Sequence, residues 1–144
     1  MNALSKTMLM LFLIVGMATG AQPVTWDAVQ AEPAPEKKSR LALELALASV
    51  DGVVAAFHEG LPEQAAAMFT RIVEAAELSL TCLEEPGAKP KHFKKAEIST
   101  RKLTRNLKSA QQQLNFAERQ QLEPVIKRIE EINNRLLTGA MRAR

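Results

Sequence analysis

The stretch Leu41-Ala-Leu-Glu-Leu-Ala-Leu-Ala-Ser-Val-Asp-Gly-Val-Val-Ala-Ala-Phe57 decides the fold class of this 144-residue chain. Its apolar residues recur every three or four positions, the spacing that places them on one side of an α-helix. Gly52 interrupts the run, and we interpret it as a place where a neighbouring helix approaches closely. The stretch predicts an amphipathic helix over about 36–58, whose core seam consists of Leu43, Leu47, Val50, Val54 and Phe57.

Three more helices follow the first. Gly60 and Pro62 mark a stop and a start, because glycine ends helices and proline is tolerated in their first turn. We therefore expect a second helix over about 62–83. A stretch rich in proline and glycine, 84–90, separates it from helices over about 90–114 and 116–138. The predicted core faces of these three helices are Ala65, Phe69, Ile72, Ala76 and Leu83; Phe93, Ala96, Thr100, Leu103, Leu107, Ala110 and Leu114; and Leu122, Ile126, Ile129, Ile132 or Asn133, and Leu136.

The last predicted helix carries three local signals. Asn115 followed by Glu118 fits a capping box, in which each side chain accepts a hydrogen bond from the other residue's backbone amide. Pro124 lies inside the helix and predicts a kink or a break. Gly139 predicts its end.

No segment alternates apolar and polar residues with the period of a strand, so the predicted fold class is all-α. Short connections favour antiparallel neighbours. We expect two antiparallel helical hairpins forming a four-helix bundle-like domain over 36–141.

The N-terminus has the pattern of a secretory signal peptide over 1–21. Lys6 precedes an unbroken apolar run, Met8–Val15, and small residues at Ala18, Gly20 and Ala21 fit cleavage after Gly20 or Ala21. The alternative is a retained N-terminal anchor. Residues 22–35 contain three prolines and are predicted to be a tether, with Trp26 packing onto the domain or dipping into a membrane interface. The predicted localisation is periplasmic or secreted, with no transmembrane span after processing.

Charge divides the chain into two halves. Residues 22–86 hold four Lys/Arg and eleven Asp/Glu, a net charge of −7, whereas residues 87–144 hold fourteen and five, a net charge of +9. The second half also concentrates cations on one helix. At 100° per residue, Lys94, Arg101, Arg105 and Lys108 fall within about 60° of one another. The predicted interaction surface is Lys91, Lys94, Lys95, Arg101, Lys102, Arg105 and Lys108, which we call the basic face.

Three interpretations of the basic face compete. It is a solvated surface partly neutralised by the acidic first hairpin, or it attracts anionic partners such as lipid headgroups, cell-wall polymers or acidic protein segments. The third interpretation is nucleic-acid binding. It is disfavoured because export would separate the protein from cytosolic DNA, and because no platform of aromatic residues lies between the cations to stack on bases.

Catalytic, metal-binding and cofactor-binding patterns are not found in the sequence. His58, at a helix end, is predicted to act as a cap, and His92 lies among lysines that would repel a metal ion. Cys82, the single cysteine, lies near Glu84 and Glu85, which oppose thiolate formation. A pairing of Cys82 between two molecules is the alternative role. We predict a non-enzymatic protein without cofactors.

Two resemblances concern the second half of the chain. Residues 91–98 and 104–107 resemble segments of uncharacterised exported bacterial helical proteins. Phe116-Ala-Glu-Arg-Gln-Gln-Leu122 resembles the Leu-Thr-x-x-Gln helix start of Spy/CpxP-type periplasmic chaperones, although the threonine is missing and the glutamine is displaced. These resemblances imply an envelope location. The functional hypothesis is an exported protein that binds an envelope protein or an anionic polymer or lipid surface; the alternative is a holdase-like chaperone for unfolded clients. The oligomeric state is left open.

Overall fold

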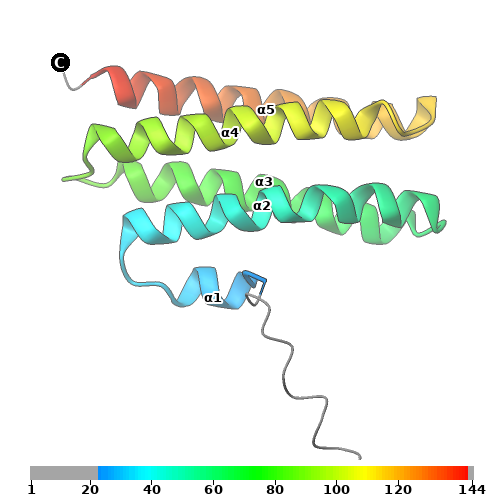
Figure 1. Cartoon of the computed structure of the whole chain (residues 1–144), viewed down its shortest axis with the longest axis horizontal. Helices are drawn as coiled ribbons and strands as arrows, with labels where there is room; N and C mark the ends of the chain where they lie inside the picture. Colours follow the sequence, from blue (N-terminus) through cyan, green and yellow to red (C-terminus); the bar gives the residue numbers. More distant parts are fainter. Residues whose placement is uncertain (1–22, 143–144) are drawn as a thin grey trace, which may run out of the picture.

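A computed structural model describes residues 23–142 of the chain, and every regular element among them is a helix (Figure 1). The leader predicted over 1–21 lies outside the described residues. The helices are α1 (Trp26–Ala31), α2 (Pro35–His58), α3 (Pro62–Glu84), α4 (Pro90–Gln111) and α5 (Phe116–Met141). The all-α prediction is therefore confirmed.

The turn between α2 and α3 follows directly from Gly60. This residue has a φ of 72°, which glycine adopts without strain. Its amide donates to the carbonyl of Phe57 at 3.1 Å, and the amide of Leu61 donates to the carbonyl of Ala56 at 2.8 Å. These two hydrogen bonds form a Schellman motif, which satisfies carbonyls at the end of α2. The chain then reverses and Pro62 opens α3.

The two hairpins, α2–α3 and α4–α5, pack side by side with an unexpected neighbour relation. α2 lies beside α3 and α4, and α5 lies beside the same two helices, so the consecutive helices α3 and α4 meet over a short stretch only. Each helix from α2 to α5 reverses the direction of the one before it, so α2 and α4 run in the same direction, as do α3 and α5 (Figure 1). The sequence predicted the hairpins but not which helices of different hairpins become neighbours.

The bundle core is built from the predicted faces of α3, α4 and α5. Ile72, Leu103, Leu107, Ile129 and Leu136 are each fully buried. In α2 the core side is rotated from the predicted seam, since Leu47 and Val54 are half-buried while Ala42, Ala46 and Val53 are fully buried. Small alanines allow the neighbouring helices to approach on that side.

The predicted tether contains a short helix, which corrects the expectation for part of 22–35. The hydroxyl of Thr25 accepts a hydrogen bond from the amide of Ala28 at 3.1 Å and caps α1. Val29 is fully buried, and Trp26 packs against the core with the guanidinium carbon of Arg71 4.3 Å from its ring centroid. Trp26 thus takes the packing role that the sequence favoured, with a cation–π contact in addition.

The prediction for Gly52, inside α2, is confirmed, whereas the prediction for Gly139, inside α5, is wrong. A Cβ on Gly52 would lie 3.1 Å from Cε of Met68 on α3, which confirms the predicted close approach. Gly139 does not end α5, contrary to prediction. A Cβ there would lie 2.3 Å from Cδ1 of Phe93, so the glycine makes room for the Phe93 ring of α4.

The last two helices differ from their predicted bounds in small ways. α4 ends at Gln111, three residues early, and turn-type hydrogen bonds continue to Leu114. α5 continues through Pro124 to Met141, so the predicted break does not occur. Pro124 and Gln120, whose carbonyl loses a helical donor, are both exposed, and water can therefore replace the missing hydrogen bond. The capping box of Asn115 and Glu118 is confirmed, with bonds of 2.9 and 3.0 Å.

Helix α2 is the one described helix long and apolar enough to cross a membrane by length and composition, with a mean hydropathy of 1.6 over its most apolar window. In this fold its apolar side packs against α3 and α4. A core helix passes the same test, so the pattern does not assign a membrane span.

Candidate functional site: the basic face of α4

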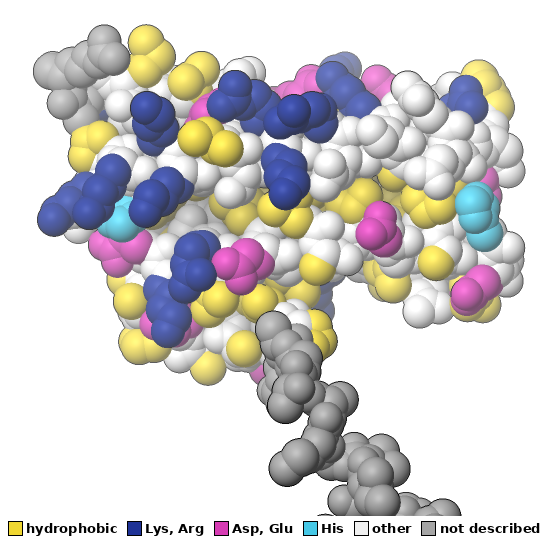
Figure 2. Space-filling view, viewed as in Figure 1, with side chains coloured by type: hydrophobic (Ala, Val, Ile, Leu, Met, Phe, Trp, Pro, Cys, Tyr) yellow, Lys and Arg dark blue, Asp and Glu magenta, His cyan; other side chains and the backbone are white. Residues whose placement is uncertain are grey.

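Helix α4 separates its apolar and polar residues more sharply than the other three long helices, α2, α3 and α5. Leu103 and Leu107 are fully buried on one side, and Ala96 and Ala110 are nearly so. All seven cations predicted for the basic face are exposed: Lys91, Lys94, Lys95, Arg101, Lys102, Arg105 and Lys108. Figure 2 shows Lys and Arg side chains gathered over the α4–α5 half of the molecule.

Most of these cations have no ionic partner in the described part of the chain. Arg101 pairs with Glu97 at 3.2 Å and Lys108 pairs with Glu130 at 2.9 Å. Among residues 23–142, the other five make no ion pair within 4.0 Å. The basic face is therefore not neutralised by its neighbours.

The acidic first hairpin directs its carboxylates elsewhere. Glu77 of α3 pairs with Arg128 of α5 at 3.0 Å, and Glu84 pairs with Arg135. Arg128 also donates to Glu131, and its hydrogen bonds to the two carboxylates raise the pKa of its guanidinium. Acidic residues of the first half thus pair with basic residues of the second half at the α3–α5 contact. No ion pair joins α4 to α2 or α3 within 23–142.

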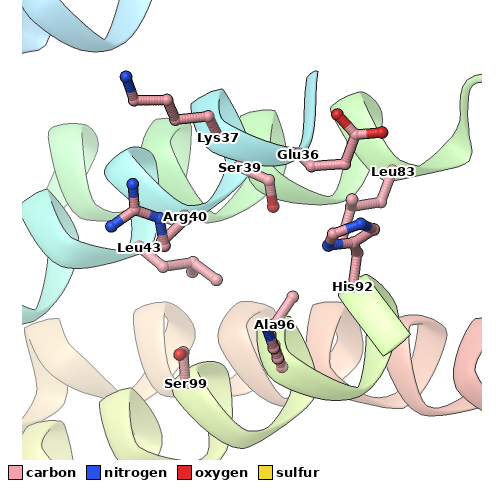
Figure 3. A pocket seen from close by; sticks show the side chains of 10 residues that line it. Glu36, Lys37, Ser39, Arg40, Leu43, Leu83, His92, Ala96 and Ser99 are labelled. Carbon is pink, nitrogen blue, oxygen red and sulfur yellow. The ribbon is translucent and has the colours of Figure 1, made fainter. Parts of the chain in front are cut away.

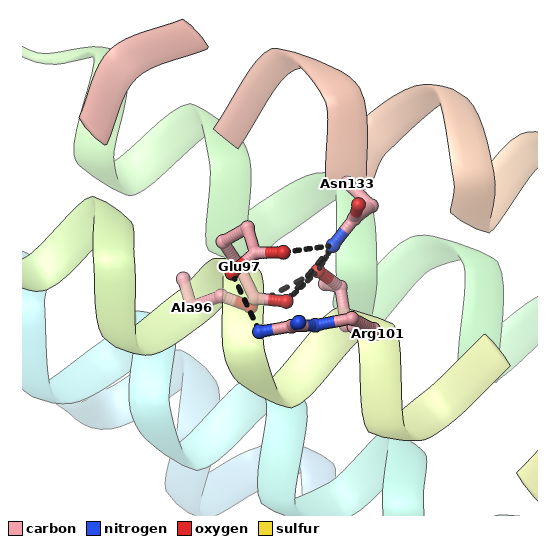
Figure 4. A network of polar contacts seen from close by, with 5 residues as sticks. Ala96, Glu97, Arg101 and Asn133 are labelled. Carbon is pink, nitrogen blue, oxygen red and sulfur yellow. Dashed lines mark hydrogen bonds and ion pairs between the residues drawn. The ribbon is translucent and has the colours of Figure 1, made fainter. Parts of the chain in front are cut away.

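A buried polar network fixes the rotation of α4 on α5 (Figure 4). Nδ2 of Asn133 donates to Oγ1 of Thr100 and to the backbone carbonyl of Glu97, both at 2.8 Å. Glu97 is only 9% exposed, and its carboxylate binds Arg101 from within the same helix. Because a buried polar group is costly when unpaired, this network favours one orientation of α4, with its cations outward. The sequence offered Ile132 or Asn133 for one core position; Ile132 is fully buried and Asn133 half-buried, and the sequence gave no sign of the partners of Asn133.

The basic face borders a groove of about 430 Å³ between α4 and α5. Arg101, Arg105 and Lys108 line it together with Glu130. Thr104 also lines it, and its Oγ1 is buried without a hydrogen-bond partner among residues 23–142. The groove thus brings three cations together, of which Arg105 makes no ion pair among residues 23–142, and guanidinium and ammonium groups suit an oxygen-rich anion.

The residues considered for other chemistry lie apart from one another. Nε2 of His58 lies 3.3 Å from the carbonyl oxygen of Gln113 and so connects the C-terminal end of α2 with the turn that follows α4. Cys82 is 5% exposed, and burial raises the pKa of its thiol above the ordinary 9.0, with Glu85 adding to the rise and Lys38 opposing it. No three His, Cys, Asp or Glu side chains within 23–142 are placed to hold a metal ion.

Two cations near α4 were missed by sequence reasoning. Lys37 and Arg40 belong to α2, in the acidic half of the chain, yet they line a groove shared with Lys95 of α4. Only the packing of α2 beside α4 brings them together. No signal in the sequence identifies that neighbour relation.

No family model, curated protein or solved structure matches this chain.

Proposed function

We propose that this protein is an exported, non-enzymatic helical protein of the cell envelope that binds an anionic macromolecular partner through the basic face of α4. The observation that carries the proposal is the set of five exposed cations on one helix that lack an ionic partner within the described residues. A surface that served stability alone would pair them, as α5 pairs Arg128 and Arg135. Unpaired cations on one face raise the local concentration of anions instead.

Apolar contact adds to the charge. Ile98 is 48% exposed and lies on the same side of α4 as Lys94, Lys95, Arg101 and Lys102. An apolar side chain surrounded by cations suits a surface with anionic groups above an apolar layer, as a lipid headgroup region has. Anionic lipid is therefore the partner that the face fits best.

The test measures binding to anionic phospholipid vesicles, with zwitterionic vesicles and polyglutamate as alternative partners. The variant Lys94→Gln/Arg105→Gln removes two cations from the basic face without breaking an ion pair. Its matched control, Lys127→Gln/Arg142→Gln, removes an exposed lysine of α5 and the exposed arginine directly after that helix. Both residues also lack ion pairs within 23–142.

At about 1 kcal/mol per cation near an anionic surface, the α4 variant should bind roughly 30-fold more weakly, and the control should change little. Equal losses in both variants would mean that net charge, not the basic face, drives binding. Undiminished binding of the α4 variant at low salt would refute the proposal. Tighter binding to polyglutamate than to vesicles would replace lipid with an acidic polymer.

Export is the second part of the proposal. Removal of 1–21 would leave all five helices whole, because α1 begins at Trp26. The mature protein should begin at Ala21 or Gln22, and intact-mass measurement of the envelope fraction tests this. A full-length chain in the cytosol would contradict export, and a full-length chain in the membrane fraction would support a retained anchor.

A holdase-like chaperone is the second candidate, and the exposed apolar side chains favour it. Phe116 is 77% exposed, Met141 is 66% exposed, and Leu61 and Leu137 are exposed as well. Such residues could hold unfolded clients through weak apolar contacts. Light scattering of an aggregating client tests this role, and a lack of suppression at stoichiometric protein would exclude it.

A further inference from the structure

A second groove, of about 340 Å³, lies between the N-terminal halves of α2 and α4 (Figure 3). Leu43 of α2, Leu83 of α3 and Ala96 of α4 form an apolar part of its lining. Ser39 and Leu43 point across the gap toward Ala96 and Ser99. The groove is distinct from the α4–α5 groove beside Arg105 and Lys108.

Cations surround this apolar lining. Lys37 and Arg40 come from α2 and Lys95 comes from α4, whereas Glu36 is the single carboxylate among the lining residues. Arg40 forms an exposed pair with Glu44 at 3.1 Å, whereas Lys37 pairs at 3.3 Å with Glu32, whose side chain is only 15% exposed. An exposed pair such as Arg40–Glu44 is weak, so Arg40 can exchange Glu44 for another anion. Lys95 makes no ion pair within 23–142.

The hydroxyl of Ser39 is the second feature that points to a ligand. Ser39 is only 2% exposed, its side chain makes no hydrogen bond within the described residues, and its oxygen is directed into the gap (Figure 3). The oxygen faces the groove, so its hydrogen-bond partner comes either from solvent or from a ligand. An acceptor atom of a ligand in the groove would supply that partner.

We propose that this groove binds one single-chain amphiphile with a carboxylate head, of the fatty-acid class. The carboxylate is held by Lys95, Arg40 and the Ser39 hydroxyl, and the chain lies along Leu43, Leu83 and Ala96. The volume is at the lower end of the range of about 300–1,000 Å³ for small-molecule sites, which admits one chain and excludes a two-chain lipid. The three lining cations exceed the one lining carboxylate, Glu36, by two positive charges, so the lining favours a ligand with an anionic head.

The test is calorimetric titration of the folded protein with decanoate below its micelle concentration, with decanol and inorganic phosphate as comparison ligands. Decanoate should bind more tightly than either, since decanol lacks the charge and phosphate lacks the chain. Lys95→Gln should weaken decanoate binding about tenfold, the loss expected when one charged hydrogen bond is removed. Lys102→Gln, which removes an exposed lysine two turns further along α4, should leave binding unchanged.

Ser99→Phe tests the groove itself, because an aromatic ring at this half-buried lining position fills the space that the chain needs. It should abolish decanoate binding while vesicle binding and helix content by circular dichroism persist. The proposal fails if decanol binds as well as decanoate, if phosphate binds as well, or if Lys95→Gln and Lys102→Gln behave alike. Lys94→Gln/Arg105→Gln should bind decanoate normally, so failure of the basic-face proposal and failure of this one give different results.

Discussion

The two contacts between parallel helices use charge in opposite ways. At the α3–α5 contact, Arg128 and Arg135 meet Glu77 and Glu84, with 51 residues separating the partners in both pairs. At the α2–α4 contact no ion pair forms within 23–142, and Lys37, Arg40 and Lys95 converge around one groove. At the first contact the charges of the two helices pair with each other. At the second, Lys37 and Arg40 pair only with nearby residues of their own segment, and Lys95 has no ion pair among these residues. A high content of charged residues therefore does not by itself indicate either stability or binding; the geometry of the neighbours decides.

The largest expected effect concerns the network that sets the orientation of α4. Asn133→Ala should lower the free energy of unfolding by about 1–3 kcal/mol, because Thr100 and the Glu97 backbone carbonyl lose a buried partner. Denaturant unfolding measures the change. Asn134→Ala is the matched control, since Asn134 is exposed and its side chain makes no hydrogen bond within 23–142. Equal effects of the two substitutions would show that the network does not hold α4 in place.

The next prediction concerns the contact between Phe93 of α4 and Gly139 of α5. Gly139→Ala should destabilise the protein by about 1–2 kcal/mol, because displacing the Phe93 ring outweighs the better helix propensity of alanine. Gly52→Ala is the control: the Met68 side chain that it meets is flexible, so this substitution should be neutral or mildly stabilising. Thermal unfolding of the two variants tests the contrast. A stabilised Gly139→Ala would mean that the ring has room to move aside.

Periodicity in the sequence was enough to predict the hairpins and most of the core. Leu103 and Leu107 were placed opposite the basic face, and both are fully buried. The same spacing placed Arg101, Arg105 and Lys108 together, and all three line one groove. These features depend only on a helix's own repeat, so local sequence determines them.

Features that depend on two helices were not predictable in the same way. Gly139 was predicted to end α5 because glycine usually ends helices, but its role depends on Phe93, 46 residues earlier in the chain. The α1 segment was predicted to be a tether because six helical residues carry little periodicity, and its burial depends on the surface that α2 and α3 provide. Lys37 and Arg40 were assigned to the acidic half because the pairing of α2 with α4 has no local signal.

A smaller effect is expected where charges are already paired. Arg128→Gln should lower the free energy of unfolding by about 0.5–1 kcal/mol, because it removes two exposed ion pairs, with Glu77 and Glu131. A double-mutant cycle with Glu77→Gln isolates the contact between helices, and its coupling energy should fall as salt is added. Vesicle binding by Arg128→Gln should stay close to wild type. A coupling energy of zero at low salt would mean that the α3–α5 pairs do not contribute to stability, which would remove one side of the comparison.

The smallest expected effect is a rise, not a fall, in the free energy of unfolding. Helix α4 has no acidic residue in its first turn, and Lys91 lies there beside further lysines, although cations are unfavourable near the positive end of a helix dipole. Lys91→Glu should therefore raise the free energy of unfolding by roughly 0.3–0.5 kcal/mol while it weakens binding to anionic vesicles. Lys127→Glu, in the middle of α5, is the control and should change neither quantity appreciably. Chemical denaturation in low salt gives the stability difference, and vesicle cosedimentation gives the binding difference. A gain in stability with a loss of binding would mean that Lys91 lowers the stability of α4 but contributes to partner binding. A loss of stability would instead mean that Lys91 has a structural role, which would contradict a basic face that serves ligand binding.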